Sequence, residues 1–201
     1  MAASSVTDII VVGIGGQGVM TAAEVLAQAA MAQGHDVKKT EVAGMAQRGG
    51  VVSSHVRFGP RVLSPVVVAG QAALVVAFEV AEALRWAGHL APGGVLLVND
   101  MRLPPPVVSL GLHAYPPDPI GVLRAQGVTV VAVDAGMASR ELGDVRLVNS
   151  VMLGAAADHL PFPPGVLRDA LLQRFRSRKP ELLELNRRAF ERGRELASRG
   201  R

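Results

Sequence analysis

Apolar residues along the chain form short runs, separated by turns and by segments of helical composition. Residues 8–12 form a β-branched run of the kind found in a strand buried on both faces of a parallel sheet. A glycine-rich turn follows, and the Ala, Leu, Glu and Gln content of residues 20–33 predicts a helix that ends at Gly34. The same patterns predict strands at 37–42, 51–58, 72–78, 95–98 and 127–133, and helices at 80–90, 147–160, 166–175 and 180–197.

The order of these elements predicts the fold class. The strand at 37–42 completes a βαβ unit with the first strand and helix. Residues 51–58 alternate as in a strand, and residues 61–68 return after a Gly-Pro turn, which predicts an inserted β-hairpin. The remaining alternation of strands and helices favours an α/β fold with a doubly wound, mostly parallel, Rossmann-like sheet.

Positive charge is concentrated near the C-terminus. Prolines at positions 161, 163 and 164 mark a boundary between a domain of residues 1–160 and a basic C-terminal helical segment of residues 161–201, which packs on it. The 201-residue chain has 21 Lys+Arg and 17 Asp+Glu, and the C-terminal segment contains eleven of the basic and five of the acidic residues. The main domain is therefore slightly acidic, and the whole chain, with one Trp, one Tyr and five Phe, offers little surface for binding nucleic acid.

Several kinds of chemistry are excluded by composition and spacing. The chain has no cysteine, so it cannot use a thiol nucleophile or hold an iron–sulfur cluster through cysteines. Its five histidines lack metal-site spacing, and the adjacent Ser54 and His55 would point to opposite faces of a strand, so we expect neither a metal site nor a catalytic residue.

We also expect a cytoplasmic protein that does not enter the membrane. The N-terminus has no basic region of the secretory type, and the longest apolar stretch, residues 65–78, is shorter than the roughly 18 residues that indicate a membrane span.

The best candidate binding site is the turn between the first strand and the first helix. Its candidate residues are Gly13, Gly15, Gly16, Gln17 and Gly18. Glycines let the backbone approach an anion, and a helix N-terminus offers unpaired N–H groups and a partial positive charge. The turn contains G-x-G-x-x-G, so in a dinucleotide-binding protein Glu41 would take the ribose hydroxyls. Alternatively, the turn packs without a ligand.

A second candidate loop follows the second strand and contains Gln47, Arg48 and Gly49. Beside glycines, Arg48 can direct its guanidinium fork at a carboxylate or phosphate. Both loops follow parallel strands, so we expect them to converge at one edge of the sheet. The alternative is a solvated surface arginine.

An ordered set of motifs resembles a known family. The motifs are Val12-Gly-Ile-Gly-Gly-Gln-Gly18, Gly44-Met-Ala-Gln-Arg-Gly-Gly50, Ala72-Ala-Leu-Val-Val-Ala-Phe-Glu79, Gly94-Val-Leu-Leu-Val-Asn-Asp100, Asn149-Ser-Val-Met-Leu-Gly154 and Asn186-Arg-Arg-Ala-Phe-Glu-Arg-Gly193. Together they resemble the gamma-type subunit or domain of 2-oxoacid:ferredoxin oxidoreductases, and are most similar to the beta subunit of indolepyruvate:ferredoxin oxidoreductase.

This resemblance implies an accessory subunit that is inactive alone. Its complex would decarboxylate indolepyruvate or another aryl 2-oxoacid, pass electrons to ferredoxin and form an acyl-CoA. The resemblance places thiamine diphosphate and the iron–sulfur clusters on a large partner subunit, in agreement with the absence of cysteine here. It also implies that the glycine turn and the adjoining basic residues contact CoA. In isolation the chain could form a homodimer.

Two other interpretations remain open at this point. The chain could be a self-contained oxidoreductase or sensor that binds NAD or FAD through the G-x-G-x-x-G turn and Glu41. Alternatively, the two loops could only build the interface with the partner subunit.

Overall fold

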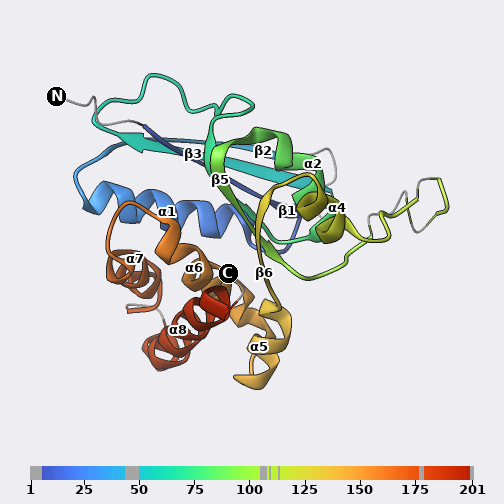
Figure 1. Ribbon diagram of the computed structural model, residues 1–201. Coiled ribbons are helices and arrows are strands. Elements are labelled where there is room, and N and C mark those ends of the chain that lie inside the picture. Colours follow the sequence, from blue (N-terminus) through green and yellow to red (C-terminus); the bar gives the residue numbers. More distant parts are fainter. Residues whose placement is uncertain are drawn as a thin grey trace.

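A six-stranded sheet forms the centre of the protein in the computed structural model, which describes residues 6–43, 50–104, 108, 110–112, 114–176 and 179–199. The strand order is β2-β3-β1-β4-β5-β6 (Figure 1). The strands are β1 (Thr7–Ile14), β2 (Asp36–Ala43), β3 (Val51–Gly59), β4 (Ala72–Ala77), β5 (Leu90–Asn99) and β6 (Thr129–Val133). β3 runs in the opposite direction to the other five strands, which are parallel to one another. The predicted mostly parallel sheet is therefore confirmed.

Helices cover both faces of this sheet, as a doubly wound fold requires (Figure 1). One face carries α1 (Val19–Ala32), α5 (Ala135–Glu141), α6 (Val148–Ala156), α7 (Pro164–Arg176) and α8 (Leu183–Arg199), and the other carries α2 (Val80–Trp86) and α4 (Pro119–Ala125). Short 3-10 helices are η1 (Ala87–His89), η2 (Val145–Leu147), η3 (Ala157–His159) and η4 (Pro180–Leu182). In the described part of the chain, no helix has the length and apolar character needed to cross a membrane.

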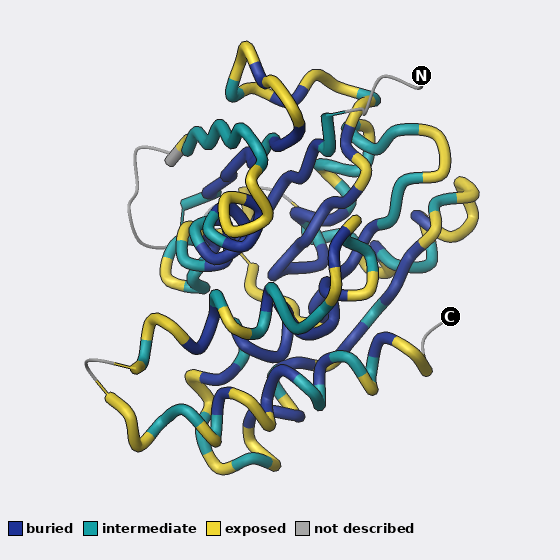
Figure 2. The backbone as a smooth tube through the Cα atoms, turned by 90° about the vertical axis from the view of Figure 1, so that its left-hand side faces the viewer, coloured by how far each residue is buried: buried dark blue, intermediate teal, exposed yellow. Residues whose placement is uncertain are grey.

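The β-branched residues of β1 explain its central position. Ile9 and Val11 pack on the α1 face, whereas Ile10 and Val12 pack on the α2 face, and all four are fully buried. Successive side chains of a strand point to opposite faces, so a continuous apolar run suits a strand covered on both sides. Figure 2 shows this buried backbone running through the middle of the molecule, with exposed residues at the outer helices and loops.

The predicted β-hairpin is wrong. Residues 61–68 form no strand, because β3 already pairs with β1 on one edge and with β2 on the other. Hydrogen bonds with side chains instead hold this segment in place. His55 and Asp36 accept hydrogen bonds from the backbone N–H groups of Val67 and Val62, respectively. Arg57 donates a hydrogen bond to the Ser64 carbonyl.

The insertion of β3 also corrects the predicted βαβ unit. β1 and β2 are parallel and joined by α1, as expected, but they are not neighbours because β3 lies between them. Further along the chain, α4 and α5 were not predicted, and the predicted 80–90 helix ends as η1, after which β5 already begins at Leu90.

The C-terminal helices share the core with α1 and the sheet. Ala189 and Phe190 of α8 are fully buried. α8 approaches α6 so closely that a Cβ on Gly154 would lie 1.9 Å from the Phe190 carbonyl oxygen, and one on Gly193 would lie 1.9 Å from the Val151 carbonyl oxygen. These two glycines allow the two helix backbones to touch.

We predict that Gly193→Ala lowers the free energy of unfolding by more than about 2 kcal/mol, because the added methyl group overlaps the α6 backbone. Gly88→Ala is the matched control, since a Cβ there meets nothing within 4 Å. Urea unfolding of both variants and the wild type measures the difference. Equal stability of the two variants would contradict the close contact between α6 and α8.

Candidate functional site

The winding of the sheet changes direction between β1 and β4. From β1 the chain crosses one face through α1 to reach β2, and from β4 it crosses the opposite face through α2 to reach β5. In open α/β sheets, ligands bind in the crevice at the carboxyl ends of strands where this reversal occurs. The glycine turn, residues 13–18, lies at the carboxyl end of β1 and therefore occupies this position.

Three glycines of the turn are required for different reasons. Gly16 and Gly18 have φ angles of +103° and +84°, in the left-handed region that favours glycine. Gly13 has no such angle, but a Cβ there would lie 2.7 Å from Oε1 of Gln17 and 2.9 Å from Cβ of Phe78. Gly16 is exposed, so its backbone is open to a ligand.

Gln17 fastens the turn to β4. Its Oε1 accepts a 2.7 Å hydrogen bond from Ile14 N, and its Nε2 donates a 3.2 Å bond to the carbonyl of Phe78, the residue that follows β4. Both ends of this amide are thus engaged inside the protein. Gln17 shapes the candidate site by spanning the crevice between β1 and β4.

Asn149, in the first turn of α6, fastens the turn from the other direction. Its Nδ2 donates a 2.8 Å hydrogen bond to the carbonyl of Gly18, the N-cap of α1, which has no side-chain cap of its own. A Cβ on Gly18 would lie 2.2 Å from this nitrogen, so the contact itself demands glycine. Sequence reasoning missed this role. The signals were a polar pair, Asn149-Ser150, at the start of an otherwise apolar helix, and the place of Asn149 in one of the motifs that resemble the family.

Glu79 is a second residue at this sheet edge that sequence reasoning left without a role. The residue is 1% exposed. Its carboxylate accepts hydrogen bonds from the backbone N–H groups of Ala81, Glu82 and Leu103, and one from the hydroxyl of Tyr115. Burial, and then the hydrogen bond to Glu79, raise the pKa of Tyr115. Glu79 therefore caps α2 and holds the segment after β5 against it.

The residue that follows the second candidate loop lies beside the glycine turn. Gln47, Arg48 and Gly49 lie outside the described residues. Gly50, which follows them, accepts a 2.8 Å hydrogen bond at its carbonyl from Gly15 N, and this bond extends the pairing of β1 with β3 by one residue. The convergence of the two loops stays a prediction.

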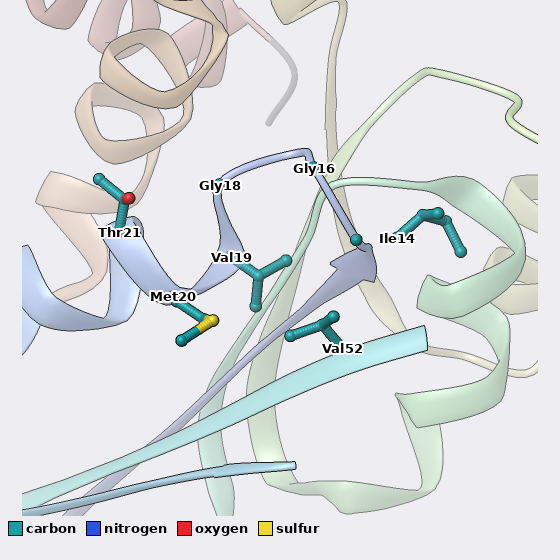
Figure 3. Close-up of a pocket in the computed structure, with 8 residues that line it drawn as sticks. Ile14, Gly16, Gly18, Val19, Met20, Thr21 and Val52 are labelled. Atoms are coloured by element: carbon teal, nitrogen blue, oxygen red, sulfur yellow. The ribbon is translucent and has the colours of Figure 1, made fainter. Parts of the chain in front are cut away.

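A cleft of about 520 Å³ opens beside the turn (Figure 3). It is lined by Ile14, Gly15, Gly16, Gly18, Val19, Met20, Thr21 and Val52. The first backbone bond of α1 runs from Ala22 N to Gly18 O, so the N–H groups of residues 19–21 have no acceptor within the helix. Free N–H groups beside an apolar wall suit a ligand with an anionic and an apolar part.

The lining residues suit binding better than catalysis. Thr21 provides the only side-chain hydroxyl among them, and none carries a carboxylate, an imidazole or an amine. Within the described ranges, no group of three His, Asp or Glu side chains could hold a metal ion. His55 lies on the α2 face, where its ring packs edge-on against Trp86, and its Nδ1 is occupied by Val67 N.

Glu41 is poorly placed for the dinucleotide interpretation. In that motif the acidic residue ends the strand beside β1, but here β3 occupies this place and Glu41 lies one strand further away. Its carboxylate also binds Lys39 Nζ at 2.8 Å. Burial lowers the pKa of Lys39, but its hydrogen bonds to Glu24 and Glu41 outweigh burial and raise it overall.

Comparison with known proteins decides the family. Residues 8–196 match the model of the pyruvate ferredoxin/flavodoxin oxidoreductase family. The chain belongs to this family. Its membership confirms the resemblance inferred from the ordered motifs.

Individual relatives agree in length as well as in sequence. The chain is 37% identical over 190 residues to the indolepyruvate oxidoreductase subunit IorB of Thermococcus kodakarensis, a match that covers 92% of this chain and 93% of that protein. It is also similar to a keto/oxoacid ferredoxin oxidoreductase gamma subunit from Geobacter sulfurreducens, with 25% identity and a TM-score of 0.67. This match covers 96% of this chain and 99% of that one.

A third relative carries the same fold within a longer chain. This is a 2-oxoglutarate:ferredoxin oxidoreductase from Magnetococcus marinus, solved with 2-oxoglutarate, coenzyme A and succinyl-CoA bound. The TM-score is 0.75 at 21% identity, and the match covers 96% of this chain but 31% of that one.

We predict that Gly18 and Asn149 are energetically coupled. Gly18→Ala should cost more stability than Gly16→Ala, because both positions have positive φ but only Gly18 would place a methyl group against Asn149. Asn149→Ala removes that clash. In the double variant Gly18→Ala/Asn149→Ala, the loss in free energy of unfolding should therefore be smaller, by at least about 1 kcal/mol, than the sum of the losses in the two single variants. Urea unfolding measures these losses. Additive effects would mean that the two residues do not interact.

Proposed function

We propose that this chain is the gamma-type accessory subunit of a thiamine-diphosphate-dependent 2-oxoacid:ferredoxin oxidoreductase. The reaction would be the oxidative decarboxylation of indolepyruvate or another aryl pyruvate to an acyl-CoA, with electrons passed to ferredoxin. The observation that carries this proposal is the match of residues 8–196 to the family, together with nearly full-length similarity to an indolepyruvate oxidoreductase subunit.

The chemistry of the chain supports a division of labour between subunits. With no cysteine, it does not fit an iron–sulfur cluster held by cysteines. Among the described residues, the lining of the cleft beside the glycine turn contains no acid–base pair, and the chain alone would be inactive. Thiamine diphosphate supplies the decarboxylation chemistry from a large partner subunit, which also carries the clusters and delivers electrons to ferredoxin. Such a complex would reside in the cytoplasm.

The contribution of this chain is to bind part of CoA. The exposed backbone of Gly16 and the free N–H groups at the start of α1 fit its pyrophosphate, and the apolar wall of the cleft fits its pantetheine arm. The CoA-facing residues would be Gly15, Gly16, Gly18, Gln47, Arg48 and Gly49. Gly13, which is buried against Gln17 and Phe78, and Gln17 itself would hold the turn from inside. The CoA bound to the Magnetococcus relative is consistent with this role.

A second candidate role is purely structural, in which the two loops only form the interface with the partner. The hydrogen bond from Gly15 N to the Gly50 carbonyl, at the border of the second loop, is compatible with both roles. An isolated chain, lacking its partner, would present the same surface and could dimerise through it. A kinetic experiment separates CoA contact from assembly.

Reconstitution tests the proposed function. The large subunit purified with this chain should reduce a dye in the presence of indolepyruvate and CoA, and the large subunit alone should not, because part of the CoA site is then missing. Calorimetry of the isolated chain with NAD and FAD serves as the control for the dinucleotide interpretation. Equal activity with and without the chain, or tight binding of NAD or FAD, would refute the proposal.

Arg48→Ala tests the role of the second loop. The apparent KM for CoA should rise about tenfold with little change in kcat, the loss expected when a charged hydrogen bond to phosphate is removed. Arg61→Ala is the control, because Arg61 is exposed in the segment between β3 and β4. Loss of co-purification would assign Arg48 to the interface, and unchanged assembly and kinetics would assign it neither role.

A further inference from the structure

A second cleft borders the glycine turn from the side of α6, α7 and α8. Its volume is about 440 Å³, and its lining includes Gly16, Gly18 and Thr21 of the turn and of α1, and Arg174 of α7. Gly16, Gly18 and Thr21 also line the first cleft, so the turn separates two neighbouring spaces. A ligand that lies across the turn can enter both.

The second cleft is positively charged. Among the described residues, its charged lining residues are Arg146 and Arg174, and none of the lining residues is a carboxylate. Arg146 is already engaged: its Nη2 lies 2.7 Å from Oδ2 of Asp144, and its hydrogen bonds lower the pKa of that carboxyl to about 2.

Arg174, in the last turn of α7, is the available cation. Within the described part of the chain, no carboxylate lies within 4.0 Å of its guanidinium. The charge of Arg174 contributes least among the causes that lower the pKa of Glu24. The main cause is the hydrogen bond from Lys39, which that carboxylate binds. An arginine held at a cleft without a carboxylate partner suits a phosphate.

The walls of the cleft are held in place by side-chain hydrogen bonds. Asn149 binds the Gly18 carbonyl, and the neighbouring Ser150 Oγ donates a 2.6 Å bond to Oδ1 of Asn186 in α8. Asn186 Nδ2 in turn donates to the Leu182 carbonyl at 2.8 Å. The turn, α6 and α8 are thereby linked, while Met101, Val145 and Phe175 add apolar lining. A cleft of this size and mixed lining accommodates a nucleoside.

We propose that the second cleft binds the adenosine end of CoA, with Arg174 holding the ribose 3′-phosphate while the pyrophosphate lies at the glycine turn. This inference rests on the proposed function. CoA carries two separate phosphate centres, a pyrophosphate and a phosphomonoester on the ribose, and the two clefts offer two adjoining places for anions. NAD and FAD lack the phosphomonoester. Arg174 thus distinguishes CoA from these dinucleotides.

The test compares CoA with dephospho-CoA, which lacks only the 3′-phosphate, in the assembled enzyme. Arg174→Gln should raise the apparent KM for CoA about tenfold, leave kcat unchanged and leave the KM for dephospho-CoA unchanged. Arg174→Lys, which keeps the charge but loses the fork, should give an intermediate KM for CoA. Arg176→Gln is the matched control, because Arg176 is exposed on the same helix and does not line the second cleft. It should behave as the wild type.

Calorimetry with adenosine 3′,5′-bisphosphate gives a readout that is independent of turnover. The wild-type complex should bind this probe more tightly than the Arg174→Gln complex. The inference is overturned if Arg174→Gln changes the KM for both CoA forms equally or for neither, or if Arg176→Gln has the same effect. A wild-type complex that turns over without any need for CoA would overturn the proposed function as well, so the two failures can be told apart.

Discussion

The hydrogen bond from Asn149 to the carbonyl of Gly18 fixes where the candidate site lies. Gln17 fixes the turn locally through Ile14 N, but Gly18 begins α1 without a side-chain cap and with a positive φ angle. Asn149 supplies the missing contact at the start of α1 from α6. Because α6 is in backbone contact with α8 through Gly154 and Gly193, the turn is aligned with the C-terminal helices as well as with the sheet. The C-terminal helices are thus part of the scaffold of the site.

Most polar side chains around the turn already form hydrogen bonds within this scaffold. Gln17 binds Ile14 N and the carbonyl of Phe78, and Asn99 donates a hydrogen bond to the same Phe78 carbonyl and accepts one from Ala135 N. Glu79 accepts hydrogen bonds from three backbone N–H groups and from the Tyr115 hydroxyl. Among the described residues of the two clefts, what remains available to a ligand is backbone N–H, the Thr21 hydroxyl, apolar wall and arginine. Such a surface suits the binding and orientation of an anionic cofactor, as the proposed accessory role requires.

Much of the fold could be predicted from the sequence, but the neighbour relations could not. Apolar runs and glycines identified β1, α1, β4 and β6, because these signals are local. Nothing local shows that β3 inserts between β1 and β2, and this one insertion both removes the predicted hairpin and moves Glu41 away from the turn. The turn and its glycines were likewise predictable, whereas the role of Asn149 depends on a contact with a residue 131 positions earlier. Gln17 was expected to face a ligand, but its amide is used within the protein.

If CoA lies across the glycine turn of this chain in the assembled complex, its binding should protect the backbone amides of the turn. Hydrogen–deuterium exchange of the complex, with and without CoA, measures this protection. We expect slower exchange on CoA binding for amides of residues 15–21 and 145–150, and unchanged exchange for residues 61–71, which lie before β4 and line neither cleft. Unchanged exchange at residues 15–21, in a complex saturated with CoA and active with it, would show that CoA does not lie there.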